Sequence, residues 1–453
     1  MRWRWALLLA PLAVLAGCPG APESGRDGGP VDDGRPLVVV SGADLTSREG
    51  EGVRQALIDE WNADDGNRPA RLVELPRTED GQRSELIAAL QSGSADFDVV
   101  NLDTTWVPEF AEAGLIRPLD DALLEAGFLA QAAEAGRWRG RAYAVPFNTD
   151  VGLLYYREDL LAALGGTPED LLADGTLGAL IDARPAGQEH PLYITQLRPY
   201  EGLTVNTLEA LWSVGVELVD ERGRYRGTEA ELRRGLAELL RVADGAKLSE
   251  RARDADETVA LREFTGDGGG DGPSGVVLMR NWPFAYPQLD ATLPAQTGFG
   301  VLRLPGAAAL GGQSLAVPAG SARAADAERL IRFLTAEPGS QRRLLEAGFA
   351  PALREAYGAA EPDCAAAPRV VRRTEAQRVP EGAVRGLPPG YPEFLWCALQ
   401  EARARPASPY YPAFSRELRQ EVAQLLAGGG SLEGTAERLH QSLALALEGR
   451  LPP

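Results

Sequence analysis

The sequence has few of the residues on which metal, redox or nucleic-acid chemistry depends. Its 453 residues include three cysteines, two methionines and two histidines. Because His190 and His440 lie at no metal-ligand spacing from a cysteine, we expect neither a metal site nor a cofactor. Basic residues are also in the minority, with 46 Lys and Arg against 65 Asp and Glu and a formal net charge of -19. A nucleic acid needs a basic face for its phosphates, so the charge argues against that partner.

Long apolar runs are scarce, and the one near the start predicts processing rather than structure. Residues 1–18 place Arg2 and Arg4 before an apolar stretch too short to span a bilayer and end in Leu-Ala-Gly-Cys. That ending resembles the lipobox of bacterial lipoproteins and predicts a signal peptide with lipidation at Cys18. The alternatives are a plain secretory signal cleaved elsewhere or a chance cysteine. Residues 19–36, rich in Gly, Pro, Asp and Ser, predict a flexible tether.

The remaining chain contains no stretch long enough for a transmembrane helix. We therefore expect an exported, soluble body that a lipid anchors to the cell membrane, facing the periplasm or the extracellular side. Once Cys18 is assigned to the anchor, Cys364 and Cys397 remain. In an exported protein these two could close one disulfide, and the alternative is two buried free thiols.

The pattern of strands and helices predicts an α/β protein. Its length predicts two domains, and 44% hydrophobic with 25% charged residues is an ordinary globular composition. A strand at 37–41, a helix at 53–62 and a strand at 71–75 form a βαβ unit, which indicates a parallel sheet. After residue 159 the predicted helices become longer, and strands recur at 275–279, 298–304 and 311–317.

Residues 140–161 form the longest nearly continuous apolar and aromatic stretch after the leader. We expect one strand up to Pro146, which cannot donate a ladder hydrogen bond, and a second, fully buried strand over 151–156. A strand that ends, turns on polar residues and begins again is a plausible crossing between two lobes. Asn148, Thr149 and Asp150 would then lie at the mouth of a cleft. The alternative is an ordinary strand-turn-strand with a solvated turn.

Four segments in order resemble one family. They are FDVVNLDTTWVPEFAEAGLIRPLDD at 97–121, the stretch at 140–161, LMRNWPFAY at 278–286, and GGQSLAVPAGSARAADAERLIRFLTAEPGSQRRLLEAGFAPALREAY at 311–357. Together they resemble the extracellular solute-binding proteins of ABC sugar importers, the family of maltose- and trehalose-binding proteins. The resemblance covers about residues 37–360, and 408–422 resembles the family's C-terminal segment, whereas 362–400 departs from its pattern.

The resemblance implies a two-lobed, periplasmic-binding-protein-like α/β fold. Each lobe would be a mostly parallel sheet flanked by helices, with the ligand cleft between the lobes. Residues 37–148 plus 300–356 would form the N-terminal lobe, and 149–299 plus 357–453 the C-terminal lobe. In this family the lobes close around a sugar by a hinge motion, and the permease subunits recognise the closed form. We expect the chain to be a monomer.

The resemblance also implies binding residues. Asp103, at the end of a buried strand, would accept hydrogen bonds from sugar hydroxyls, although it could equally cap the next helix. Trp282 and Tyr286 would offer an aromatic platform for the apolar face of a pyranose, although both could be core residues. The other implied ligand-binding residues are Asp150, Asn148, Asn206, Gly312, Gln313, Arg77, Thr78, Asp44 and Arg405. The alternative role of Asn206 is a helix cap, and that of Arg405 is a surface charge.

An enzyme is not expected. A glycosidase needs two carboxyl groups on opposite sides of the bond, but the pairs Asp32-Asp33 and Asp120-Asp121 are adjacent residues that point apart. No Gly-x-Ser-x-Gly motif occurs. The sequence therefore predicts a lipid-anchored carrier that passes a sugar such as trehalose, maltose or another oligosaccharide to an ABC permease. The alternatives are a sensing lipoprotein, or another small polar solute such as a polyamine or a phosphate ester. The acidic candidates disfavour an anion.

Overall fold

The structure is a computed structural model. It describes residues 34–42, 52–75, 79–93, 96–125, 127–172, 175–185, 190–220, 222–267, 275–358, 361–373 and 387–450. The predicted signal peptide, Cys18 and most of the tether lie outside these ranges. Within them, no helix has both the length and the apolar character needed to cross a bilayer.

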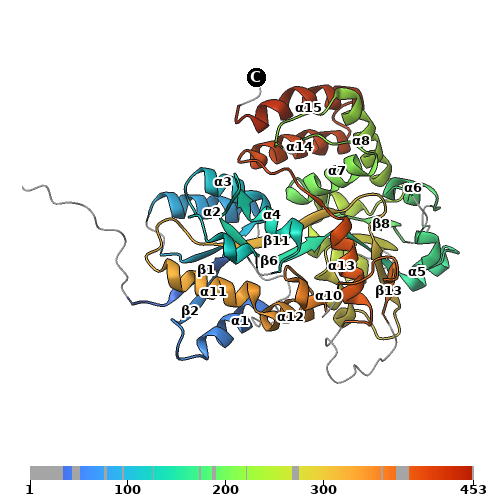
Figure 1. Cartoon of the computed structure of the whole chain (residues 1–453). Coiled ribbons are helices and arrows are strands. Elements are labelled where there is room, and N and C mark those ends of the chain that lie inside the picture. Colours follow the sequence, from blue (N-terminus) through green and yellow to red (C-terminus); the bar gives the residue numbers. More distant parts are fainter. Residues whose placement is uncertain are drawn as a thin grey trace, which may run out of the picture.

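The first lobe is built on a seven-stranded sheet with the order β12-β6-β11-β3-β1-β2, and β14 pairs with β11. Helices cover both of its faces (Figure 1). The strands are β1 (Leu37–Ser41), β2 (Ala70–Glu74), β3 (Val99–Asp103), β6 (Ala144–Val151), β11 (Ala309–Ala316), β12 (Ala350–Pro351) and β14 (Arg403–Ala404). The helices are α1 (Val53–Asn62), α2 (Glu79–Gln91), α3 (Val107–Glu112), α4 (Ala130–Ala135), α11 (Ala324–Ala336) and α12 (Pro338–Glu346). A small ribbon, β4 (Arg137–Trp138) with β5 (Arg141–Ala142), completes the lobe.

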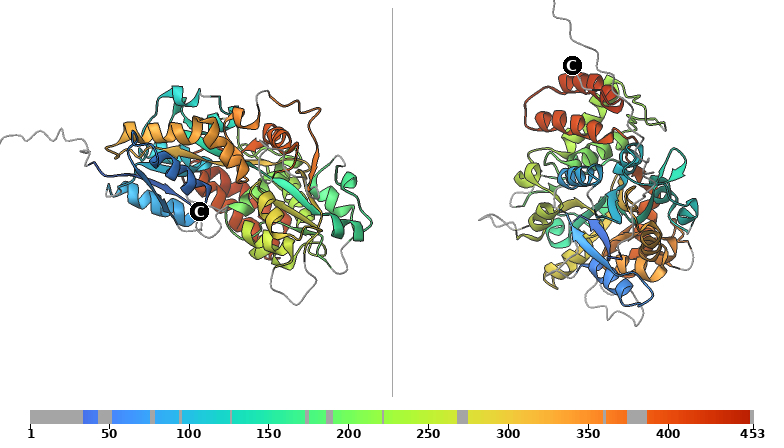
Figure 2. Two further views of the ribbon diagram at one scale, coloured as in Figure 1. Left: turned by 90° about the horizontal axis from the view of Figure 1, so that it is seen from below. Right: turned by 90° about the vertical axis from the view of Figure 1, so that its left-hand side faces the viewer.

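The second lobe is built on a five-stranded sheet with the order β13-β10-β7-β9-β8. Its strands are β7 (Leu153–Arg157), β8 (Tyr193–Ile194), β9 (Leu278–Asn281), β10 (Phe299–Arg303) and β13 (Val370–Arg372). The associated helices are α5 (Glu158–Ala163), α6 (Leu177–Asp182), α7 (Glu201–Ser213), α8 (Glu229–Val242), α9 (Glu257–Thr265), α10 (Ala285–Thr292), α13 (Tyr391–Glu401), α14 (Tyr411–Leu426) and α15 (Leu432–Leu447). The two lobes lie side by side in the left view of Figure 2, and in the right view the first lobe lies in front of the second.

Both sheets are mixed, which corrects the expectation of mostly parallel sheets. The βαβ prediction is right for the start of the chain, where β1 pairs in parallel with β2 and with β3. However, β11 runs antiparallel to both β3 and β6, and β7 runs antiparallel to both β9 and β10. These antiparallel pairs all include a strand next to a passage of the chain between the lobes, where β6 is followed by β7 and β10 by β11.

The first crossing lies later than the sequence predicts. Strand β6 continues through Pro146 as far as Val151, and the break before β7 is Gly152 alone. Proline is tolerated inside this strand because the pairing with β11 shifts register beside it, between Gln313 and Ser314.

The second crossing also differs from its expected position. Strand β10 pairs with β7 in the second sheet, whereas β11 belongs to the first sheet. The chain therefore passes between the lobes at 304–308, and Phe299–Arg303 lies with the second lobe rather than the first. The C-terminal segment crosses as well, since β14 pairs with β11 before α14 begins.

The last two helices pack on α7 and α8 at the top of the second lobe (Figure 1). Buried polar contacts fix this packing: the hydroxyls of Thr204 and Ser415 lie 2.7 Å apart, and Ser415 also donates to Glu201 at 2.6 Å. The hydroxyl of Tyr411 donates to the same carboxylate. The start of α7 is thereby joined to the start of α14, next to the gap between the lobes.

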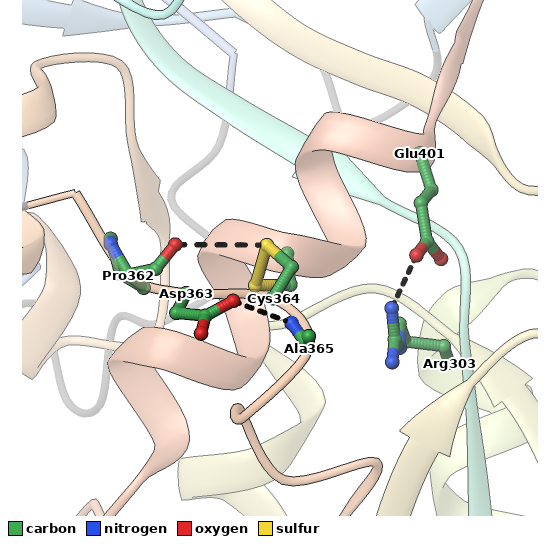
Figure 3. The surroundings of a disulfide bond; sticks show 7 residues. Arg303, Pro362, Asp363, Cys364, Ala365 and Glu401 are labelled. Atoms are coloured by element: carbon green, nitrogen blue, oxygen red, sulfur yellow. Dashed lines mark hydrogen bonds and ion pairs between the residues drawn. A yellow bond between two sulfur atoms is a disulfide. The ribbon is translucent and has the colours of Figure 1, made fainter.

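A disulfide connects the segment after the first lobe to α13. Cys364 and Cys397 are bonded, with their Cα atoms 5.5 Å apart, and Cys397 is buried. Figure 3 shows the bond beside an ion pair between Arg303 of β10 and Glu401 of α13. Both connections fix α13 to its surroundings, in the region where the sequence departs from the family pattern.

We predict that the double variant Cys364→Ser/Cys397→Ser loses about 4 kcal/mol of unfolding free energy. The bond joins residues 33 positions apart, and in the chain-entropy description a closed loop of this size restricts the unfolded chain by about that amount. Urea denaturation at neutral pH measures the difference, and wild-type protein unfolded in reductant should show the same loss. Equal midpoints for oxidised wild type and the double variant would contradict the prediction.

Candidate binding cleft

A cavity of about 480 Å³ lies between the two lobes. The first lobe contributes the carboxyl end of β3 and the crossing strands β6 and β11, and the second contributes the starts of α7 and α9 and the end of β9. The polar lining residues include Arg54, Asp80, Gln82, Asp103, Asn148, Asp150, Arg198, Glu201, Asp256, Glu257, Thr258, Gln313 and Arg405. The aromatic ones are Trp106, Tyr200, Trp282, Phe284 and Phe349. Seven predicted binding residues therefore share one cavity: Asp103, Asn148, Asp150, Trp282, Gly312, Gln313 and Arg405.

Two glycines of β11 allow backbone to form part of the wall. Gly312 has a φ of +125°, and a Cβ there would lie 2.4 Å from the carbonyl oxygen of Asn148. Only glycine can adopt this positive φ and also leave room for the carbonyl of Asn148 at so short a distance. A Cβ on Gly311 would lie 3.4 Å from the ring of Trp282. The glycine pair therefore brings the crossing strands close to each other and to the indole.

Trp282 is fixed on one face and at its ring nitrogen. The guanidinium of Arg280 lies 3.9 Å from the ring centroid, and the indole Nε1 donates to Glu257 Oε1 at 3.2 Å. Because Arg280 is only 1% exposed, the cavity meets the opposite face and the edges of the ring. An indole held this way presents a rigid apolar surface.

Asp103 serves both of the roles that the sequence allows. Its Oδ1 accepts from the backbone N and from the hydroxyl of Thr105, at 2.8 and 2.7 Å, which caps the helical turn that follows β3. Both carboxylate oxygens also accept from Nη2 of Arg405 at 3.0 Å. Asp103 lines the cavity at the same time.

Arg405 is a cavity residue and not a surface charge, being 8% exposed. While its Nη2 donates to Asp103, its Nη1 donates to Glu201 at 2.8 Å. Asp103 ends a strand of the first lobe and Glu201 begins α7 of the second. One guanidinium thus joins carboxylates of both lobes, and it offsets the repulsion between two acids in a site of low dielectric.

Burial raises the pKa of the Asp150 carboxyl to about 7, against the opposing charge of Arg54 and with a smaller contribution from the nearby Asp103. Asn148 Nδ2 donates to its Oδ2 at 3.1 Å. Near neutral pH this carboxyl is therefore divided between its protonated and ionised forms. It is able to donate or to accept a hydrogen bond in the cavity.

Sequence reasoning missed several lining residues. Arg54 donates to Gln313 Oε1 at 2.6 Å and to the carbonyl of Gly42 at 2.8 Å. On α1 it occupies the same face as Leu57 and Trp61. An arginine on the apolar face of an amphipathic helix is a signal that the sequence contained.

A second missed group comes from the second lobe. Arg198 donates to Asp256 at 2.9 Å and lies 4.7 Å from the ring centroid of Tyr200. Asp256 also caps α9 through the backbone N of Val259. These residues come together only through tertiary contacts, and their charged, low-hydrophobicity surroundings in the sequence give no sign of a site.

Two predicted residues lie away from the cavity, which corrects their placement. Asn206 is inside α7, where its Oδ1 accepts from Thr195 at 2.5 Å and its Nδ2 donates to the carbonyl of Gly202 at 2.8 Å. Tyr286 is 1% exposed and packs against Phe299 and Tyr391. Asn206 is therefore not the helix cap that the sequence also allowed, because α7 begins five residues earlier at Glu201. Tyr286 takes the core position that was its alternative. Asp44, Arg77 and Thr78 lie outside the described residues.

We predict that Asp150→Asn changes how stability depends on pH. The pKa of Asp150 is about 7, above its ordinary value of 3.8, so the wild type loses stability as the pH rises from about 4 to about 7. The variant lacks this loss and should gain roughly 2 kcal/mol relative to wild type, a value discounted for partial solvent contact. Urea denaturation across this range measures it, and a difference that stays constant with pH would contradict it.

The fold and the cleft define a class: a two-lobed α/β binding protein with its cavity between the lobes. A model of the bacterial extracellular solute-binding protein family matches residues 56–370. A Deinococcus radiodurans protein named "Probable ABC transporter-binding protein" is 30% identical over 314 residues, covering 66% of this chain and 72% of that protein. The chain therefore belongs to the bacterial extracellular solute-binding protein family.

Solved structures show the same fold. Maltose-bound MalE3 of T. maritima superimposes with a TM-score of 0.71 and 23% identity, covering 90% of this chain and 98% of that one. The GacH receptor of Streptomyces glaucescens, solved unliganded and with acarbose, superimposes with a TM-score of 0.69 and 20% identity. The match covers 92% of this chain and 99% of that one. UgpB of Mycobacterium tuberculosis in complex with glycerophosphocholine superimposes with a TM-score of 0.70 and 17% identity. The match covers 91% of this chain and 98% of that one.

Proposed function

We propose that this protein is the lipid-anchored substrate-binding component of an ABC transporter that captures a sugar, such as trehalose, maltose or another oligosaccharide. The observation that supports this most is the cleft itself: the exposed side of Trp282 faces the same cavity as Asn148, Asp150 and Glu257. A pyranose has an apolar C–H face and an equatorial rim of hydroxyls. An indole and a set of amide and carboxylate groups complement those two features.

The cavity's charges favour a neutral polyol over an anion. Arg405 is engaged by Asp103 and Glu201, and Arg198 by Asp256. Asp150 and Glu257 face the same space without an ion pair to either arginine. Arg54 lines the cavity as well and donates to Gln313 and to the carbonyl of Gly42. The lining nevertheless holds six carboxyl groups against three guanidinium groups, so an anionic ligand would meet an excess of acidic groups. Of the three solved structures described above, two contain maltose or acarbose and one contains glycerophosphocholine. The charges of the cavity therefore carry the choice of a neutral sugar.

The binding cycle follows from where the groups lie. A sugar placed on Trp282 contacts the second lobe, and its far hydroxyls reach Asn148 and Asp150 on the crossing strand β6. Contacts with both lobes stabilise the closed arrangement relative to an open one, since a ligand shifts an equilibrium by its differential affinity. The closed protein would deliver the sugar to the permease as a monomer held at the membrane through lipid on Cys18. It makes or breaks no bond in the sugar.

We predict that Trp282→Ala and Asp103→Ala each weaken sugar binding at least tenfold. The first removes the stacking surface, and the second removes an acceptor and releases Arg405. Isothermal titration against a panel of mono- and disaccharides measures both effects and identifies the ligand. Circular dichroism should show that both variants remain folded.

Trp138→Ala is the matched control for the indole. Trp138 also donates its Nε1 to a glutamate, Glu112, and lies beside an arginine, Arg139, but it is outside the cavity. Its loss should leave sugar affinity within twofold of wild type. If the folded wild-type protein binds no sugar in the panel, the assignment of the ligand is wrong. Hydrolysis of maltose, trehalose or their nitrophenyl glycosides would overturn the carrier function.

A further inference from the structure

A buried ion pair lies behind the binding cavity. Arg280 lies on β9 and is 1% exposed, and Glu209 lies on α7 and is 5% exposed. The pair is bidentate: Arg280 Nη2 lies 2.6 Å from Glu209 Oε1, and Nε lies 3.1 Å from Oε2. Neither side chain lines the cavity. Burying two charges costs desolvation energy that their attraction only partly returns, so stability alone is a poor reason for this pair.

The pair touches two of the three crossings between the lobes, the first at Gly152 and the second just before Ala309. Glu209 Oε1 accepts from the backbone N of Ala309, the first residue of β11, at 2.9 Å. The carbonyl of Ala309 accepts in turn from the backbone N of Gly152 at 3.3 Å. Gly152 is the single residue between β6 and β7. A Cβ on it would lie 2.4 Å from Glu209 Oε1 and 2.7 Å from Arg280 Nη2.

The same guanidinium also supports the aromatic surface of the cleft. Arg280 lies 3.9 Å from the centroid of Trp282, on the face turned away from the cavity. A planar guanidinium can stack on a ring while its edge binds a carboxylate. Arg280 therefore contacts at once the ring that faces the ligand and the glutamate that binds the crossing backbone.

We propose that Arg280 is a positioning residue that, with Glu209, couples the orientation of Trp282 to the backbone at the two crossings, so that the stacking surface and the hinge move as one unit. This inference rests on the proposed function for its ligand but not for its geometry. A sugar on Trp282 would then act directly on the segments about which the lobes turn. Arg280 itself would not touch the sugar.

The test begins with ligand-free, full-length protein carrying Arg280→Met. Two signals are followed: amide hydrogen exchange of peptides covering Gly152 and Ala309, and the fluorine resonance of Trp282 in protein labelled with 5-fluorotryptophan, assigned by its loss in Trp282→Phe. We expect exchange at least tenfold faster in both peptides, together with a shifted or broadened Trp282 resonance. Maltose is the binding probe, and its affinity should fall at least tenfold.

Arg373→Met is the matched control. Arg373 also forms an ion pair, with Asp290 at 2.9 Å, and its guanidinium lies 5.6 Å from the ring centroid of Phe299. Neither contact involves the backbone at Gly152 or Ala309. It should leave the Trp282 resonance, the two peptides and maltose affinity unchanged. Arg280→Lys separates positioning from a merely structural role: it should restore slow exchange through the retained ion pair, while the Trp282 resonance stays altered because the flat guanidinium is gone.

If Arg280→Met fails to fold, the double variant Arg280→Met/Glu209→Gln removes both buried charges and should give the same two ligand-free signals. Slow exchange at both peptides, or an unchanged Trp282 resonance, in a folded variant overturns the proposal. A wild-type protein that binds no sugar would contradict the proposed function alone. The exchange and fluorine results would still decide whether the pair couples ring and crossings.

Discussion

The repulsion between carboxylates that are held close together is the constraint on which this cleft depends. An acidic chain places Asp103, Asp150 and Glu201 around one cavity, where the low dielectric strengthens their repulsion. Arg405 offsets two of these charges by bridging Asp103 and Glu201. Asp150 is left with a raised pKa. Arginines from distant segments of the chain thus reduce the repulsion between the acidic groups of the site. One of them, Arg405, comes from the C-terminal segment, which is therefore part of the site.

The arginines also tie the site to the lobes. Arg405 spans the first and second lobes directly, from β3 to the start of α7. Arg280 connects the second lobe's indole to the backbone at which the chain crosses. Because each guanidinium has two geometrically fixed donor edges, it links groups from segments that lie far apart in the sequence. Sugar capture by lobe closure would therefore work through residues that a list of ligand contacts would omit.

Local patterns were enough for much of the fold. Helix α1 at Val53–Asn62 and strand β1 at Leu37–Ser41 lie at the predicted residues, because their apolar periodicity is the same in the sequence and in the core. The antiparallel pairing of β11 with β6 could not be predicted, since it depends on contacts some 160 residues apart. In the site, Asp103 and Trp282 were predicted from the family resemblance, which places binding residues where buried strands end, and both line the cavity. Arg198 reaches the cavity only through tertiary contacts, and Tyr286 shares its spacing with core residues.

The most direct test of the cleft is a crystal structure of the protein grown with the sugar that titration identifies. We expect electron density for that sugar between the lobes, with a pyranose ring against the open face of Trp282 and hydroxyls within hydrogen-bond distance of Asn148 or Asp150. A sugar bound elsewhere on the surface, with the cavity between the lobes unfilled, would contradict it.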